Sequence, residues 1–92
     1  MIGVDVTSLP YQQKITYKAI RYIRLCRNLT QTQFRAICKI DQGVLAKLER
    51  NELPLTLHYE IRILDGCSAL NLTDFEMLSV KRLVDLQQQR GL

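Results

Sequence analysis

The sequence predicts an all-α domain of five short helices, and three observations lead to this prediction. The chain has 92 residues, of which 47% are hydrophobic, enough for one modest core. From about residue 11 onward, the apolar residues recur every three or four positions, which is the period of helices packed on one side. The connections between these runs are short, and no pair of strand-like segments is present. The helices are therefore expected to pack against one another.

Residues 1–10 are expected to form an extended arm rather than a helix. Ile2, Val4 and Val6 alternate with small or polar residues, which is the period of a β-strand. Since the chain offers no second strand, the segment is expected to remain an arm that can pair with the arm of a second copy. The rest of the chain, residues 11–92, is expected to be a single domain.

The first helix is predicted over about residues 11–27. Its inward-facing stripe has spacings of four, four and three, and consists of Ile15, Ala19, Ile23 and Cys26. Lys14, Lys18 and Arg21 form a basic stripe on the outer face. This stripe is either an ordinary solvated helix face or a set of contacts to the phosphates of a nucleic acid.

Two short helices joined by a tight turn are predicted over about 31–38 and 42–50. The apolar residues of this region are Phe34, Cys38, Ile40, Leu45 and Leu48, with gaps of four, two, five and three. A single helix does not produce the gaps of two and five. A capping box at Thr30 begins the first of these helices, and Asp41 is expected to cap the second. Pro54 then prevents the second helix from continuing.

Two further helices complete the predicted bundle. Thr56 is expected to cap a helix over about 57–70. Thr73 and Glu76 form a second capping box, which opens the last helix over about 74–89.

The last predicted helix carries apolar residues on more than one face. One stripe has a three-four spacing, and the remaining apolar residues lie on a second arc. A helix packed on one side needs a single stripe, so the surplus indicates either a helix lying in a groove or a surface for a second protein chain. The residues expected at a dimer or partner surface are Met77, Val80, Leu83, Val84 and Leu86.

Composition restricts the function only loosely. The chain has 13 Lys and Arg against 9 Asp and Glu, a net charge of +4 that permits a polyanionic partner without requiring one. The apolar runs are too short to span a membrane. An odd number of cysteines, 3, without a C-x-x-C pair predicts a reducing compartment such as the cytosol. His58 has no nucleophile or metal ligand at a telling spacing, so we expect no catalytic residue, no metal or other cofactor, and no enzymatic activity.

Three stretches of the sequence together resemble the lambda-repressor-like (XRE-type) helix-turn-helix family of DNA-binding proteins. The stretch IRYIRLCRNLTQTQF is similar to the first helix of the family and the entry to its second. VLAKLERNELP is similar to its recognition helix and the following loop, and LNLTDFEML to the junction of its last two helices. The resemblance covers Ile20 to about Met77. It implies a five-helix domain with an N-terminal arm, in the cytoplasm of a bacterial or phage-infected cell.

The resemblance also implies roles for individual residues. Arg24 and Glu49 stand where the family pairs its first helix with its recognition helix. The residues expected to read bases of double-stranded DNA in the major groove are Gln42, Val44, Lys47 and Asn51. The residues expected to contact phosphates are Gln31, Lys18, Arg21, Lys39 and Arg50. A homodimer is also implied, with its interface in the C-terminal part.

Two positions depart from the pattern of the family. Arg35 stands in the middle of the second helix, where the family prefers a small residue. We expect Arg35 to extend its charged end to solvent. Lys39 stands in the turn, where the family prefers glycine with a positive φ angle. We expect a different turn conformation at Lys39.

Two functions remain open from the sequence. The first is a sequence-specific transcriptional regulator, a repressor of the phage or bacterial mobile-element type. The second is a helix-turn-helix fold used to bind another regulatory protein, as an accessory factor or anti-repressor. The second function stays open because Gly43 and Ala46, at positions that usually carry reading side chains, offer no hydrogen bond to a base.

Overall fold

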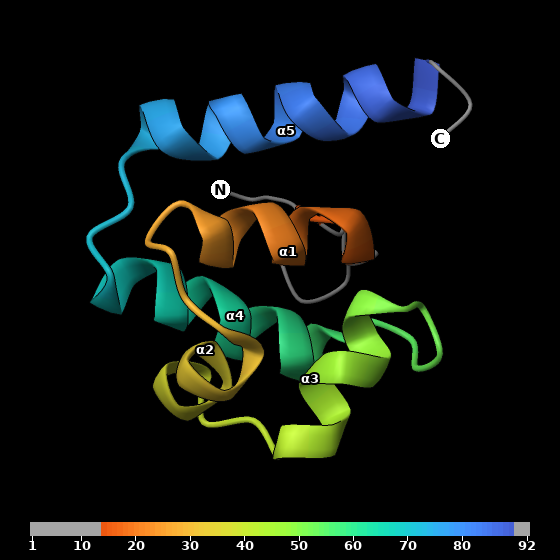
Figure 1. The fold of residues 1–92 in the computed structure, drawn as a ribbon, viewed down its shortest axis with the longest axis vertical. Coiled ribbons are helices and arrows are strands. Elements are labelled where there is room, and N and C mark those ends of the chain that lie inside the picture. The colour runs from red at the N-terminus through yellow and green to blue at the C-terminus, as the bar shows by residue number, and fades with distance from the viewer. Residues whose placement is uncertain (1–13, 90–92) are drawn as a thin grey trace, which may run out of the picture.

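The computed structural model describes residues 14–89, and within them the chain forms five α-helices and no β-strand (Figure 1). The helices are α1 (Tyr17–Leu25), α2 (Gln31–Cys38), α3 (Gln42–Glu49), α4 (Leu57–Ala69) and α5 (Asp74–Gln89). The predicted all-α class is therefore confirmed. The predicted arm, residues 1–10, lies outside the described residues. None of the five helices is long and apolar enough to cross a membrane.

The first helix begins at Tyr17, later than predicted, because a carboxylate holds the chain before it. The backbone N–H groups of Lys14 and Ile15 donate to Oε2 of Glu60, at 2.7 Å and 2.8 Å. Thr16, the N-cap residue, then has an extended backbone. Glu60 itself is fully buried in the first turn of α4. The predicted helical conformation of residues 14–16 is therefore wrong.

Each of the first four helices is followed by one residue with a left-handed backbone. These residues are Asn28, Lys39, Asn51 and Asn71, with φ angles of 57° to 60°. Asparagine tolerates this conformation better than most residues, which explains three of the four. Lys39 adopts it as well, with φ 59° and ψ 45°. The different turn conformation expected at Lys39 is therefore wrong, and a lysine bears the local strain.

The N-termini of the helices confirm two predicted capping boxes and correct two other predictions. The boxes consist of Thr30 with Gln33 and of Thr73 with Glu76, each with both reciprocal bonds at 2.9–3.1 Å. Asp41 and Thr56 have the extended backbone of N-cap residues. Their predicted N-cap positions are therefore confirmed, but neither side chain accepts a capping bond from the described backbone, which corrects the expected side-chain capping.

The core lies where α1, α2, α3 and α4 meet, and α5 covers α1 from the other side (Figure 1). The largest fully buried apolar side chains are Ile20, Ile23, Phe34, Leu45, Leu48 and Ile63. The predicted inner stripe of the first helix is buried at Ile15, Ala19 and Ile23, whereas Cys26 is half-buried. Burial of each large apolar side chain contributes roughly 1.5–3 kcal/mol, so these residues dominate the stability of the fold.

Helices α2 and α4 approach closely at Gly66. A Cβ atom added to Gly66 would lie 2.5 Å from Sγ of Cys38 and 3.7 Å from its Cα atom. Such a contact cannot form unless one helix or the sulfur moves, so close packing requires glycine here. Gly43 in α3 is the opposite case, because an added Cβ would meet no described atom within 4 Å.

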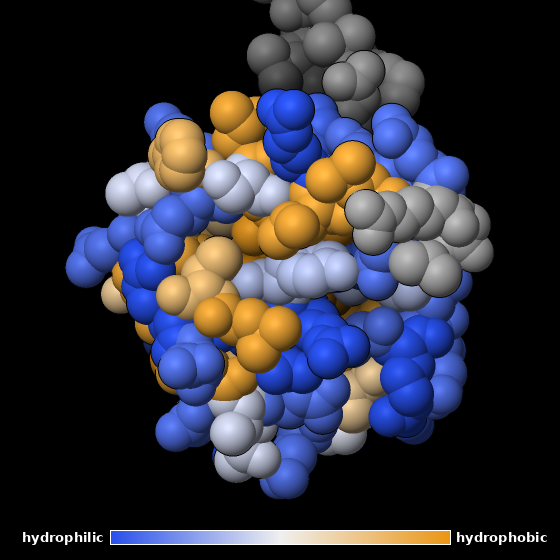
Figure 2. Space-filling model, turned by 45° about the horizontal axis from the view of Figure 1, so that its top comes forward, coloured by the Kyte–Doolittle hydropathy of each residue, from blue (hydrophilic) through white to orange (hydrophobic). Residues whose placement is uncertain are grey.

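Helix α5 packs one apolar stripe inward and leaves the other in solvent. Val80 and Val84 are buried, so placing them on an exposed partner surface was wrong; they belong to the core. Met77 is half-buried and packs against the core. The exposed row consists of Phe75, Leu78, Leu83 and Leu86. Figure 2, with the α5 side turned forward, shows surface hydrophobic side chains in patches bordered by hydrophilic ones.

Candidate nucleic-acid interface

Helices α2 and α3 present one surface at an end of the molecule. Figure 1 shows α2 nearly end-on and α3 lying across the view, so the two helices cross at a steep angle. Leu45 and Leu48 are fully buried on the inner side of α3. Gln42, Gly43 and Lys47 are exposed on its outer side. The pair of helices therefore offers one face of α3 to a partner while the other face anchors it.

A polar network fixes the C-terminal end of α3 to its neighbours. Arg24 of α1 donates to both carboxylate oxygens of Glu49, at 2.9 Å and 3.1 Å. A third bond from Arg24 reaches the carbonyl of Leu29 at 3.1 Å. Gln31, the first residue of α2, donates its amide N–H to Glu49 at 3.1 Å. The ion pair predicted between Arg24 and Glu49 is thus present. Together with Gln31 it connects α1, α2 and α3.

The residues expected to read bases differ in their exposure to solvent. Gln42, Lys47 and Asn51 are exposed. Val44 is half-buried and packs against the core, so it does not stand on the fully exposed face. Asn51 has a φ angle of 60° and follows the last turn of α3. Asn51 therefore helps to terminate α3 through its left-handed backbone, independently of what its side chain contacts.

The residues expected to contact phosphates do not form one continuous patch. Gln31 is tied to Glu49, as described above. Arg50 donates to Glu52 at 2.7 Å and 3.0 Å, which neutralises its charge locally. Lys18 and Arg21 line a shallow cleft together with Glu49, and therefore lie near the C-terminal end of α3.

Lys39 belongs to a separate cluster that sequence reasoning did not find. Arg62 of α4 donates to the carbonyl of Lys39 at 3.0 Å and to Nε2 of His58 at 3.2 Å. His58 also makes an edge-on ring contact with Tyr59, with centroids 5.3 Å apart. The spacing of four between His58 and Arg62 could have placed them on one helix face. It could not have predicted the contact with the α2–α3 turn.

Arg35 is half-buried on α2. Its Nε atom is buried and has no hydrogen-bond partner among residues 14–89. The expected escape of its charged end to solvent is therefore incomplete at this nitrogen, since a buried N–H without an acceptor is destabilising.

A second arginine, Arg27, forms a cluster at the α4–α5 junction. It donates to Oε1 of Glu76 at 3.0 Å, and to the carbonyls of Leu70 and Asn71 at 3.2 Å and 3.1 Å. The bond from the Arg27 guanidinium to Glu76, followed by the bond from the N–H of Thr73, lowers the pKa of Glu76 to about 2. Arg27 and Glu76 are 49 residues apart in the sequence, so no local spacing predicts their contact.

The three cysteines behave as core residues. Burial raises the pKa of the Cys38 thiol to about 12 and that of Cys67 to about 11. Thiols with such pKa values are weak nucleophiles at neutral pH. Within residues 14–89, no three His, Cys, Asp or Glu side chains gather as metal ligands would.

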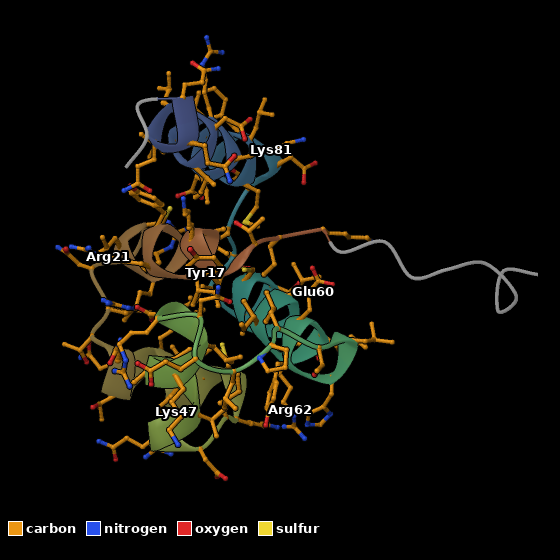
Figure 3. All side chains as sticks on the ribbon, turned by 90° about the vertical axis from the view of Figure 1, so that its right-hand side faces the viewer. Tyr17, Arg21, Lys47, Glu60, Arg62 and Lys81 are labelled. Atoms are coloured by element: carbon orange, nitrogen blue, oxygen red, sulfur yellow. The ribbon has the colours of Figure 1, made fainter. Side chains whose placement is uncertain are left out.

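Comparison of the chain with protein-family models, curated proteins and solved structures finds no match. The functional assignment therefore depends on the arrangement of α2 and α3 and on the side chains that they expose. Two exposed polar residues, Gln42 and Lys47, provide the hydrogen-bonding groups on the outer side of α3. Lys47 and Arg62 lie at the same end of the molecule, whereas Lys81 lies at the opposite end (Figure 3).

Proposed function

We propose that the chain is a sequence-specific DNA-binding transcriptional regulator that inserts α3 into the major groove of double-stranded DNA. One observation carries the proposal. Arg24 and Gln31 bond Glu49 and so fix the C-terminal end of α3. Gln42, in the first turn of α3, and Lys47, in its last turn, stay exposed on its outer side. A recognition helix enters the major groove with its outer side exposed while its inner side is fixed to the rest of the domain. The more specific type, a repressor of a phage or mobile element, comes from the sequence resemblance.

The chemistry of the exposed side chains supports base reading at two positions. The amide of Gln42 can bond N6 and N7 of adenine, and the ammonium of Lys47 can bond O6 and N7 of guanine. Each good contact discriminates against a wrong base by about 1–3 kcal/mol. Gly43 adds no hydrogen bond, so one copy of α3 specifies few bases.

A homodimer would increase the number of bases read, because two symmetry-related copies read two half-sites about one DNA turn apart. The proposed dimer surface is the C-terminal part of the exposed row on α5, formed by Leu83 and Leu86. Neither residue belongs to the core. Apolar side chains in a row of this kind commonly mark a protein–protein contact.

The phosphate contacts proposed from the resemblance would come from both sides of α3. Lys39 lies in the α2–α3 turn, and Lys18 and Arg21 lie toward the other end of α3. Arg50 would exchange its carboxylate partner Glu52 for a phosphate on binding. Contacts of this kind strengthen binding to all sequences alike and make it dependent on salt.

Selection from a library of random DNA duplexes tests the proposal. The unmodified 92-residue chain and its Gln42→Ala and Lys47→Ala variants are each taken through the selection, with Lys81→Ala as the matched control. Lys81 is an exposed lysine at the opposite end of the molecule (Figure 3). We expect the two α3 variants to select altered motifs, and Lys81→Ala to select the motif of the unmodified chain. Base reading by α3 is excluded if all four proteins select one motif.

A second function, binding to another regulatory protein, is favoured by the charges around α3. Asp41 precedes the helix, and Glu52 follows it in a pair with Arg50, so acidic groups stand at both ends of the reading face. Asp41 would repel a phosphate, and Glu52 offsets the attraction of Arg50 for one. Under this alternative the exposed row on α5 contacts a regulator, and the chain alone selects no DNA motif. Sedimentation of the purified chain would then give a monomer.

A further inference from the structure

A largely apolar groove of about 530 Å³ separates the start of α1 from α4 and α5. Its apolar lining consists of Ile15, Ala19, Leu64, Met77, Leu78, Val80 and Val84. The charged residues Lys14, Lys81 and Asp85 also line it. Grooves of this volume and lining bind apolar segments or ligands. No residue of α3 lines the groove. Figure 1 shows α5 and α3 toward opposite ends of the molecule.

The described part of the chain begins at the wall of this groove. Lys14, Ile15 and Thr16 line the groove and directly precede α1. Thirteen residues come before them in the sequence. At about 3.3 Å per residue, such a segment reaches at most roughly 45 Å. The 16 residues of α5 span about 24 Å, so the segment is long enough to follow the groove from end to end.

Glu60 leaves an open hydrogen-bond acceptor at the point where this segment joins the fold. Its Oε2 atom accepts the N–H groups of Lys14 and Ile15. Its Oε1 atom is buried without a hydrogen-bond partner among the described residues. A buried carboxylate oxygen without a donor is destabilising, so a donor is expected close by. The residues that immediately precede Lys14 in the sequence carry the next backbone N–H groups after the two that Glu60 already accepts.

The chemistry of the segment matches the groove. Ile2, Val4 and Val6 alternate with small or polar residues, so an extended segment would carry its apolar side chains on one face. Its single charged side chain is Asp5. The sign of this charge is opposite to that of Lys14 and Lys81 at the groove.

We propose that residues 2–9 of this chain occupy the groove of the same molecule, with Val4 and Val6 directed toward its apolar lining. Covalent attachment favours the chain's own segment over other occupants, because a short tether gives an effective concentration in the millimolar range. The segment would cover the groove side of α5 and leave the outer residues, such as Leu83, open. This inference concerns a surface that the proposed DNA contact does not use.

Thiol labelling of the 92-residue chain tests the proposal. Leu78→Cys places a reactive thiol at the groove, and it is combined with the native arm or with Val4→Asp and Val6→Asp. We expect the acidic arm to accelerate labelling of this cysteine by about tenfold or more, because the thiol becomes accessible without a local opening step. Equal labelling rates with both arms would overturn the proposal. Background from the native cysteines is measured in the chain without Leu78→Cys.

Three controls keep the result specific. Ser68→Cys lies exposed on α4, outside both the groove and the exposed row of α5, and its labelling should be fast with either arm. Thr7→Asp adds a charge at an alternate arm position, and it should leave the protection of Leu78→Cys intact. Protection should also be unchanged when the protein is diluted. Protection that disappears on dilution would mean that the arm of a second copy fills the groove, and it would overturn the intramolecular proposal.

Discussion

Arg24 and Arg27 are three residues apart in the sequence, yet they hold different halves of the molecule. Arg24 bonds Glu49 and thereby fixes α3, with side-chain exposures of 15% and 7% for the pair. Arg27 bonds Glu76 and thereby fixes α5, with exposures of 31% and 29%. The pair behind α3 is the more deeply buried. We therefore expect the fold to hold α3 more firmly than α5.

The α3 side of the molecule is also more closely packed than the α5 side. Helix α2 packs closely against both α3 and α4, and Gly66 permits the approach to α4. Helix α5 has its principal helix contact with α1, and it leaves a groove on one side and an exposed apolar row on another. An element with fewer buried contacts opens at a lower free energy. We therefore expect changes around α3 to destabilise the whole fold and changes around α5 to act more locally.

The largest effect is expected from Arg24→Ala. Removing the guanidinium leaves Glu49 as an unpaired carboxylate in a mostly buried place, which should lower the free energy of unfolding by about 2–4 kcal/mol. Denaturant unfolding of Arg24→Ala, Glu49→Ala and the double variant measures the coupling. The double variant should lose less than the sum of the single losses. Strict additivity would show that the pair does not stabilise the α3 side.

Gly66→Ala should produce the next largest loss. The added methyl group would lie 2.5 Å from Sγ of Cys38, and overpacking of this kind lowers stability by about 1–3 kcal/mol. Cys38→Ala in the same chain removes the sulfur and should recover part of the loss. Gly43→Ala is the matched control, since it meets open space and should raise stability by up to about 1 kcal/mol. Thermal unfolding distinguishes the signs, and equal effects at the two glycines would contradict the packing argument.

The attachment of α5 should depend on pH in the acid range. The guanidinium of Arg27, followed by the N–H of Thr73, lowers the pKa of Glu76 from 4.5 to about 2. A lowered pKa means that the ionised carboxylate stabilises the folded state at pH values above its unfolded pKa. This contribution is lost as the pH falls from about 4.5 toward 2.

Comparison of the unmodified chain with Glu76→Gln measures this contribution. The difference between their free energies of unfolding should shrink as the pH is lowered through this range, because glutamine does not titrate. A difference that stays constant from neutral pH to the acid end would rule out the ionised pair as its source.

The smallest effect is expected from Arg50→Ala. The side chains of Arg50 and Glu52 are 56% and 51% exposed, so water screens their ion pair. Thermal unfolding should give the same midpoint for this variant and the unmodified chain within error. A loss as large as that of Arg24→Ala would mean that burial does not decide which arginine matters.

The sequence predicted the local features of the fold better than the long-range ones. The capping boxes at Thr30 and Thr73 marked the starts of α2 and α5, because each box lies within four residues. The pair of Arg24 and Glu49 was accessible through a family resemblance. The pair of Arg27 and Glu76 was not, since its 49-residue separation leaves no local pattern.

Two errors in the predictions share one physical cause. The first helix was extended too far toward the N-terminus because Glu60, far away in the sequence, bonds the backbone of Lys14 and Ile15. Val80 and Val84 were assigned to a partner surface because α5 carries two apolar stripes. Periodicity alone does not say which of two stripes faces the core. In both places a tertiary contact decided what local sequence left open.

Mapping a bound duplex on the 92-residue chain by NMR tests the central claim, that the firmly held α3 carries the functional surface. The duplex added is the one recovered by selection, and backbone amide shifts are followed through the titration. The account predicts that the largest shifts fall on residues 42–47 and at the start of α2, with small shifts along α5. Shifts concentrated on α5, or unchanged spectra at saturating duplex, would contradict it.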